Sequence, residues 1–154
     1  MKKLIVLLSA CLLISLLGYT QNIIAPEKVP APVKQAFATK FPAATDAKYK
    51  INKKCYEVTF KDKGIGTSAN FNTTGKWLKT ATAITESDLP KEVTSAIAKD
   101  FAGFKISEVS KVETSDKPLF YKMDLKKDKE GYKTQFSPKG DVLKRTPLKT
   151  PVKK

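Results

Sequence analysis

One pattern of apolar residues occurs twice in this chain of 154 residues, and it limits the possible folds more than any other feature. The helix-spaced set recurs 60 positions later: Val33, Ala36, Phe37 and Phe41 become Val93, Ala96, Ile97 and Phe101. A second set recurs 65 positions later: Tyr56, Val58, Phe60, Phe71, Gly75 and Leu78 become Tyr121, Met123, Leu125, Phe136, Gly140 and Leu143. Because core positions match while loops differ in length, we predict two copies of one folding unit.

Each copy is predicted to begin with a helix and to continue with short strands. In the first copy the helix-spaced apolar residues follow prolines and end before Pro42, which cannot continue a helix. Tyr56, Val58 and Phe60 alternate with polar residues, as in a strand with one covered face. The predicted strands are Ala47–Ile51, Tyr56–Lys61, Thr67–Asn72 and Trp77–Ile84. Short glycine-containing turns between them indicate an antiparallel meander. The predicted fold class is therefore α+β, with two tandem repeats that each pack one helix on a four-stranded antiparallel meander sheet.

The repeat divides the chain into five predicted segments. These are a signal peptide at 1–21, an N-terminal lead at 22–28, repeat 1 at 29–84, repeat 2 at 85–146, and a Lys/Pro tail at 147–154.

The first 21 residues have the composition of a secretory signal. A basic start precedes an apolar run from Leu4 to Leu17, which is shorter than the roughly 20 residues of a membrane-spanning helix. We expect cleavage near Thr20 or Gln21, a periplasmic or secreted protein, and no transmembrane span after signal removal. The alternative is a lipoprotein, because the residues before Cys11 resemble a lipobox. We favour simple cleavage because the apolar run continues past that cysteine.

The chain is strongly basic, with 29 basic and 15 acidic residues. Without Lys2 and Lys3, 27 basic residues and a net charge of +12 remain. Such a charge suits an anionic lipid or polysaccharide surface, an acidic protein or incidental nucleic acid, and it also suits a solvated surface that serves solubility alone. If Cys11 is removed with the signal, Cys55 stands alone and no internal disulfide forms.

The sequence argues against an enzyme. The chain contains no histidine, which removes the commonest general base and the commonest zinc ligand. The glycines around Ile65 lack the pattern of a phosphate-binding loop, and the paired carboxylates Glu86 with Asp88 and Asp128 with Glu130 suit caps and turns. We therefore expect no catalytic residues, no metal and no cofactor.

Five residues are the predicted contacts for a partner: Trp77, Lys79, Glu57, Thr59 and Lys122. Glu57 and Thr59 alternate with the apolar residues of their strand and so lie on its open face. We expect Leu78, which matches Leu143, to face inward, and this would turn Trp77 to the open face beside Lys79. Packing of Trp77 under a loop or against the other copy is the alternative.

These motifs resemble those of a known family. Tandem Val/Leu-Pro-x-x-Val-x-x-Ala-Phe/Ile-Ala helices, each followed by Tyr-x-Val/Met-x-Phe/Leu and Phe-x-x-x-Gly-x-x-Leu, resemble the PepSY-like proteins of Bacteroidetes, whose fold is like that of β-lactamase inhibitory protein. The resemblance covers roughly Val29 to Lys144. It implies a helix on a four-stranded antiparallel sheet, twice over, with the two sheets forming a concave surface.

Related domains are thought to bind or inhibit peptidases and other envelope enzymes, and the family supplies no catalytic residues to carry over. The resemblance therefore implies an exported, non-enzymatic protein-binding module that uses its open sheet face. Its partner would be an unidentified exported protein, such as a peptidase, and it would inhibit or modulate an envelope or secreted enzyme. The alternative is electrostatic binding of an anionic lipid or polysaccharide surface. No specific nucleic acid is expected.

Overall fold

Two α-helices and nine strands make up the part of the chain that the computed structural model describes, residues 23–52 and 54–148. The predicted signal peptide and residues 149–154 of the predicted tail lie outside it. The elements are β1 (Ile23–Ile24), α1 (Ala31–Lys40), β2 (Ala44–Asn52), β3 (Cys55–Asp62), β4 (Ile65–Asn72), β5 (Trp77–Ala83), α2 (Lys91–Asp100), β6 (Lys105–Thr114), β7 (Phe120–Lys127), β8 (Glu130–Phe136) and β9 (Val142–Pro147). Short 3₁₀ turns at Pro26–Lys28 and Glu86–Asp88 precede the two helices.

The nine strands form one antiparallel sheet in which every strand pairs with its neighbour in the sequence, from β1 to β9. The expectation of two separate sheets is wrong, because β5 pairs directly with β6, from Lys79 opposite Thr114 to Ala83 opposite Ser110. This pairing satisfies the backbone groups along two edges that would otherwise be open. The short strand β1, which lies in the predicted N-terminal lead, extends the sheet by pairing with β2.

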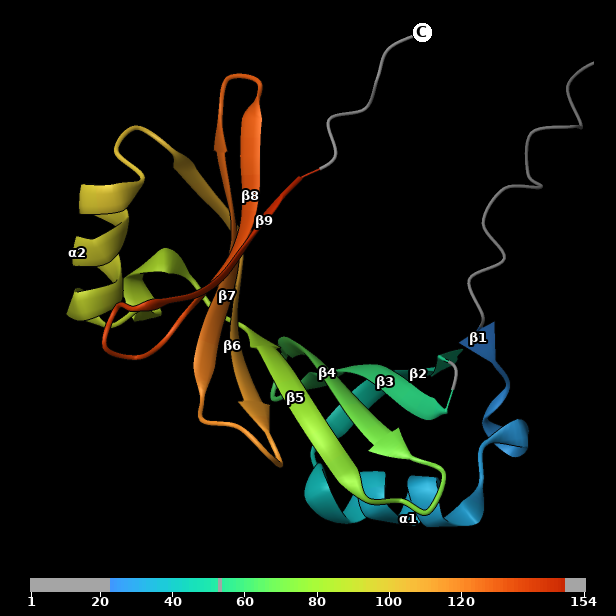
Figure 1. Cartoon of the computed structure of the whole chain (residues 1–154). Coiled ribbons are helices and arrows are strands. Elements are labelled where there is room, and N and C mark those ends of the chain that lie inside the picture. The colour runs from blue at the N-terminus through green and yellow to red at the C-terminus, as the bar shows by residue number, and fades with distance from the viewer. Residues whose placement is uncertain (1–22, 53, 149–154) are drawn as a thin grey trace, which may run out of the picture.

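Both helices cover the same face of this sheet. Figure 1 shows α1 beneath β2 to β5 and α2 beside β6 to β9, with the sheet bending between them so that its other face is left open. Val33 and Phe37 of α1 are buried on one end of the sheet, and Val93 and Ile97 of α2 on the other. The predicted helical stripes are confirmed, since Ala36, Phe41 and Ala96 are half-buried against the same clusters and Phe101 is buried.

The core consists of two clusters, one under each helix. Tyr56, Val58 and Phe60 of β3 belong to the first cluster, and the aromatic rings of Phe37 and Phe60 meet edge to face at 4.9 Å. The second contains the corresponding residues of β7, which are Tyr121, Met123 and Leu125. The period of two in the sequence therefore gives the covered face of both strands correctly.

Candidate functional site

The open face of the sheet is defined by rows of paired residues whose side chains point away from the helices. One row crosses four strands, from Glu57 through Asn70 and Lys79 to Thr114. Thr59 lies on the same face opposite Ser68, and Lys122 lies on it opposite Gln135. The structure thus brings Glu57, Thr59, Lys79 and Lys122 to one face, as expected from strand alternation.

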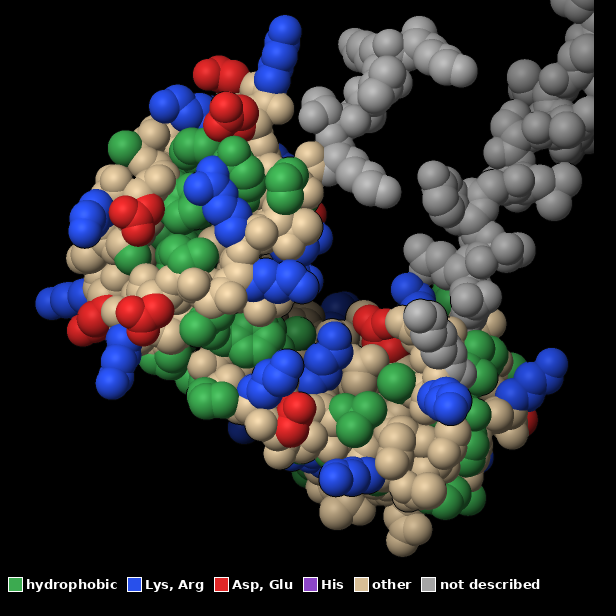
Figure 2. All heavy atoms as spheres, viewed as in Figure 1, with side chains coloured by type: hydrophobic (Ala, Val, Ile, Leu, Met, Phe, Trp, Pro, Cys, Tyr) green, Lys and Arg blue, Asp and Glu red, His purple; other side chains and the backbone are tan. Residues whose placement is uncertain are grey.

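A groove of about 1140 Å³ runs along this face where the two halves of the sheet meet. Leu78 and Lys79 of β5 line one side, and Leu143 and Lys144 of β9 line another. Phe120, at the start of β7, adds an aromatic surface. Figure 2 shows basic and hydrophobic side chains next to one another in this region. Of the five predicted contact residues, Lys79 is the one that lines the groove.

Trp77 does not face the open side, and that expectation is wrong. A β-bulge between β4 and β5 pairs Asn70 with Lys79 but Phe71 with Trp77, so Leu78 is the additional residue. Trp77 therefore shares the helix-covered face with Phe71, and Leu78 points into the groove. A shift of one residue in register exchanges the two faces of a strand.

The contacts of Trp77 bind it to the first half of the molecule. Its indole Nε1 donates a hydrogen bond to Thr80 Oγ1 at 2.9 Å, and its ring lies under the ammonium of Lys40, 4.3 Å from Nζ to the ring centre. The half-buried ring packs against the first core cluster. Trp77 is thus placed to hold the end of α1 on the sheet.

A second bulge repeats this geometry in β9. Gln135 pairs with Lys144 and Phe136 with Val142, which leaves Leu143 as the additional residue. Leu143 was also expected to face inward, and that is wrong: 55% of its surface is exposed, at the edge of the groove. The additional residue of a bulge and the residue after it, which together oppose one residue of the partner strand, here both line the groove, so each bulge directs a Leu-Lys pair at it.

Asn70 is the most deeply buried polar residue of the groove wall. Its side chain is only 9% exposed, and its Oδ1 has no hydrogen-bond partner among the described residues. A buried acceptor without a donor costs free energy, and most are paired in folded proteins.

The charge around the groove is strongly one-sided. Lys76, Lys79, Lys117 and Lys144 line it, and Asp116 is the acidic residue among the lining side chains. All four ammonium groups are on exposed side chains, and none pairs with a carboxylate within the described part of the chain. The half-buried thiol of Cys55 lies on the same wall.

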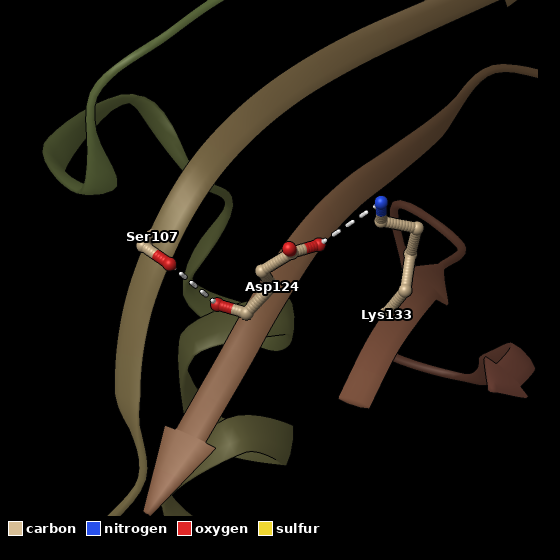
Figure 3. A network of polar contacts seen from close by, with 3 residues as sticks. All are labelled: Ser107, Asp124 and Lys133. Atoms are coloured by element: carbon tan, nitrogen blue, oxygen red, sulfur yellow. Dashed lines mark hydrogen bonds and ion pairs between the residues drawn. The ribbon is translucent and has the colours of Figure 1, made fainter. Parts of the chain in front are cut away.

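A buried carboxylate lies further along the open face. The Asp124 side chain is 7% exposed, and its Oδ1 is 3.7 Å from Lys133 Nζ on the neighbouring strand. Ser107 donates a long hydrogen bond of 3.4 Å to the backbone carbonyl of Asp124. Figure 3 shows how these three residues link β6, β7 and β8. These contacts connect three neighbouring strands beyond the groove.

Among the residues that the structure describes, three side chains have displaced pKa values, and all three lie outside the groove. Burial raises the pKa of the Tyr49 hydroxyl, and a hydrogen bond with Glu113 together with its charge raises the pKa of Lys111. Hydrogen bonds from the side chain and backbone of Thr85 lower the pKa of the Asp88 carboxyl. Within residues 23–52 and 54–148, no group of His, Cys, Asp and Glu side chains is arranged to hold a metal.

The sequence profile described as "Putative beta-lactamase-inhibitor-like, PepSY-like" matches residues 19–65 and 54–144 of the chain. The chain belongs to this PepSY-like family. The two matched segments together take in both helices and both bulges. A search of curated protein sequences found no match.

Solved structures from Bacteroides share the fold of this PepSY-like chain. A structure titled "putative periplasmic proteins" from Bacteroides eggerthii is 24% identical with a TM-score of 0.74, covering 77% of this chain and 88% of its own. A DUF2874 family protein from Bacteroides uniformis is 20% identical with a TM-score of 0.74, and the match covers 80% of this chain and 92% of that protein. A BLIP-like protein from Bacteroides fragilis is 20% identical with a TM-score of 0.70, and the match covers 77% of this chain and 86% of that protein.

No helix in the described ranges is both long and apolar enough to cross a bilayer.

Sequence reasoning missed most of the groove. Asn70, Phe120 and Lys144 were not expected there, because a groove between two strand sets depends on the pairing of β5 with β6. The bulges that turn Leu78 and Leu143 towards the groove leave no signal in the residue pattern of β5 and β9, because a bulge adds one residue without changing the composition of a strand.

Proposed function

We propose that this PepSY-like chain is an exported, non-enzymatic module that binds another protein on the open face of its sheet. The observation that carries the proposal is the groove, whose apolar walls are open to a partner while its floor is fixed by four paired strands. Occupancy by a segment of an envelope or secreted enzyme would block that enzyme, so inhibition or modulation is the proposed consequence.

The apolar surface of the groove supports protein binding. Leu143 exposes 55% of its surface there, and the aromatic side chain of Phe120 lines the same groove. Exposed apolar side chains that cluster in a concavity and are rimmed by charge are typical of sites that bind proteins. The inhibitor-like description of the family supports protein binding, and the periplasmic description of the B. eggerthii protein supports export.

We further propose that residues 29–84 and 85–146 are copies of one duplicated unit, preceded by a lead at 22–28 and followed by a tail at 147–154. The support is that both halves have a bulge at the same place, before Lys79 and before Lys144. If this is so, the groove combines the same two side-chain types from each copy.

A capture experiment with two matched variants tests the binding function. Leu143→Asp adds a charge inside the groove, and Ile65→Asp adds the same charge to a similarly exposed aliphatic residue, 49% exposed, in the β3–β4 hairpin outside it. We expect the wild type and Ile65→Asp to retain the same exported protein from a periplasmic extract, and Leu143→Asp to lose it. Titration calorimetry with the purified partner should then show the same order.

Retention of the same proteins by all three forms, or by none, would contradict the proposal. A parallel measurement with anionic lipid vesicles addresses the electrostatic alternative. If vesicle binding is strong, and Leu143→Asp and Ile65→Asp reduce it equally, the surface charge acts without the groove.

A further inference from the structure

We infer that the groove takes an extended acidic segment of the partner, in which carboxylates alternate with large apolar side chains. The inference rests on the proposed function and adds the chemistry of the bound segment. Three features of the groove carry it: the paired bulges, the unpaired lysines and the buried amide of Asn70.

The paired bulges place apolar and basic groups side by side at two points. Leu78 and Lys79 enter the groove from β5, and Leu143 and Lys144 enter it from β9. In an extended peptide, side chains alternate between its two sides. A segment with alternating acidic and apolar residues can therefore turn its apolar side chains into the groove towards Leu78 and Leu143, while the carboxylates on its outer side reach the exposed ammonium groups of Lys79 and Lys144.

The charge of the groove favours an acidic occupant. Its lining carries four lysines, Lys76, Lys79, Lys117 and Lys144, against the single carboxylate of Asp116. Within the described residues these lysines have no intramolecular carboxylate partner, so a bound carboxylate displaces no existing ion pair. The apolar side chains beside these lysines lower the effective dielectric around a bound carboxylate, which strengthens each ion pair relative to a purely polar surface.

The amide of Asn70 favours a peptide over a lipid headgroup or a free anion. Its Oδ1 is buried without a donor, and a half-turn about the last side-chain torsion exchanges Oδ1 with Nδ2. A carboxamide that offers one acceptor and two donors matches a peptide group, which offers one of each. Once that half-turn brings the oxygen to the groove, a peptide N–H can donate to it, whereas an anion has no hydrogen to donate.

Three synthetic peptides, blocked at both ends and labelled with fluorescein, test this chemistry by anisotropy. The first alternates Glu with Leu, the second alternates Gln with Leu, and the third alternates Glu with Ser. We expect the Glu/Leu peptide to bind, and the other two to bind at least about tenfold more weakly. Its affinity should also fall as ionic strength rises from about 0.01 M to about 1 M.

Single-charge variants of the protein locate the binding site. Lys79→Gln and Lys144→Gln should each weaken the Glu/Leu peptide about threefold to fivefold. Lys48→Gln is the matched control, because Lys48 is exposed on the same open face opposite Thr59 but does not line the groove. It should leave the affinity unchanged. An equal loss in all three variants would mean diffuse surface adsorption and would overturn the inference.

Asn70→Leu separates binding from folding. Replacing the amide by an apolar side chain of similar size removes the unpaired acceptor, so thermal stability should stay equal or rise. Peptide affinity should fall at least about threefold, because the peptide group loses its partner. If peptide affinity is unchanged in this variant, the assignment of Asn70 is wrong.

Different results would contradict the acidic preference of the groove and the protein-binding function. If the Gln/Leu peptide binds as tightly as the Glu/Leu peptide, the acidic preference is wrong, while loss of protein capture in Leu143→Asp would still support the binding function. If no protein depends on Leu143 for capture but the acidic peptide binds at Lys79 and Lys144, the groove binds the predicted chemistry and the protein-binding function is wrong.

Discussion

The carbonyl oxygen of Pro32 lies 2.5 Å from the position that a Cβ atom would take on Gly75. The same relationship occurs in the second half, where the Glu92 carbonyl lies 2.5 Å from a Cβ built on Gly140. In each half the tip of a hairpin therefore rests directly on the first turn of a helix. This contact explains why the Phe-x-x-x-Gly-x-x-Leu motif needs its glycine: a larger residue would separate the hairpin from the helix.

Gly75→Ala and Gly140→Ala should each lower the free energy of unfolding by about 2–4 kcal/mol. One part of this loss is the positive φ, +83° at Gly75 and +88° at Gly140, which is unfavourable for a residue with a Cβ. The other part is the contact with the helix backbone, which must move. Urea denaturation of each variant measures the sum.

Gly64→Ala is the matched control for these glycines. Its φ is +84°, but nothing lies within 4 Å of a Cβ built there, so only the backbone cost of about 1 kcal/mol remains. If Gly75→Ala is no more destabilising than Gly64→Ala, the docking of the hairpin on α1 contributes nothing to stability.

Trp77→Ala should destabilise the protein by about 2–3 kcal/mol and leave binding to the groove intact. The substitution removes the hydrogen bond to Thr80, the contact with Lys40 and the half-buried packing against the first cluster. Leu78→Ala, one position along, should have the opposite profile, with a smaller loss of stability and weaker binding of the acidic peptide. Thermal melts and anisotropy on both variants check this exchange of roles, and weaker peptide binding by a folded Trp77→Ala variant would contradict it.

Trp77 and Leu78 face the opposite sides of the sheet from those that the sequence pattern predicts, and this reversal shows where prediction from the pattern fails. Periodicity identifies the helices and the covered face of β3 and β7, because the direction of each side chain there is set by its spacing from its neighbours in the sequence. A bulge adds one residue without changing the composition of a strand, so the period of two gives the wrong face beyond it. Strand alternation therefore placed Lys79 correctly, while the alignment of Leu78 with Leu143 led to the wrong orientation for both leucines.

The groove was beyond prediction for a different reason. It depends on which strands of the two halves become neighbours, and the pairing of β5 with β6 is a contact between segments that carry no local signal for one another. The burial of Asn70 was not predictable either, since a polar residue in a strand pattern suggests an exposed position. The charge of the chain was compatible both with an anionic partner and with a solvated surface, but the location of four lysines around one groove required the fold.

Asp88→Asn should lower the melting temperature near neutral pH, and the difference from the wild type should disappear in acid. The Thr85 hydroxyl and backbone N–H both donate to Asp88 Oδ2, at 2.6 and 2.8 Å, which holds the pKa of the carboxyl below its ordinary value. A carboxyl with a lowered pKa in the folded state contributes stability above the unfolded-state pKa and loses it as the pH falls through the folded-state pKa. The loss should therefore occur below about pH 4.

Melting temperatures of the wild type, Asp88→Asn and the neighbouring Glu86→Gln between about pH 2 and pH 7 test this behaviour. The gap between wild type and Asp88→Asn should be widest at neutral pH and close at the acid end, whereas Glu86→Gln should follow the wild type throughout. A gap that stays constant with pH would show that the Thr85 contacts do not depend on the charge of Asp88.

The ion pair between Asp124 and Lys133 should be more strongly coupled than the shorter pair between Asp46 and Lys61. The first pair is 3.7 Å long with its carboxylate only 7% exposed, and the second is 3.0 Å long with side chains 63% and 58% exposed. Burial of one partner raises the cost of leaving it alone, and solvent screens the exposed pair. Double-mutant cycles with Asp→Asn and Lys→Gln changes, measured by urea denaturation, should give about 1 kcal/mol for Asp124–Lys133 and below about 0.5 kcal/mol for Asp46–Lys61. Equal coupling in the two cycles would mean that Asp124 is as well solvated as Asp46, and the contact drawn between Asp124 and Lys133 in Figure 3 would then add no more stability than an exposed ion pair.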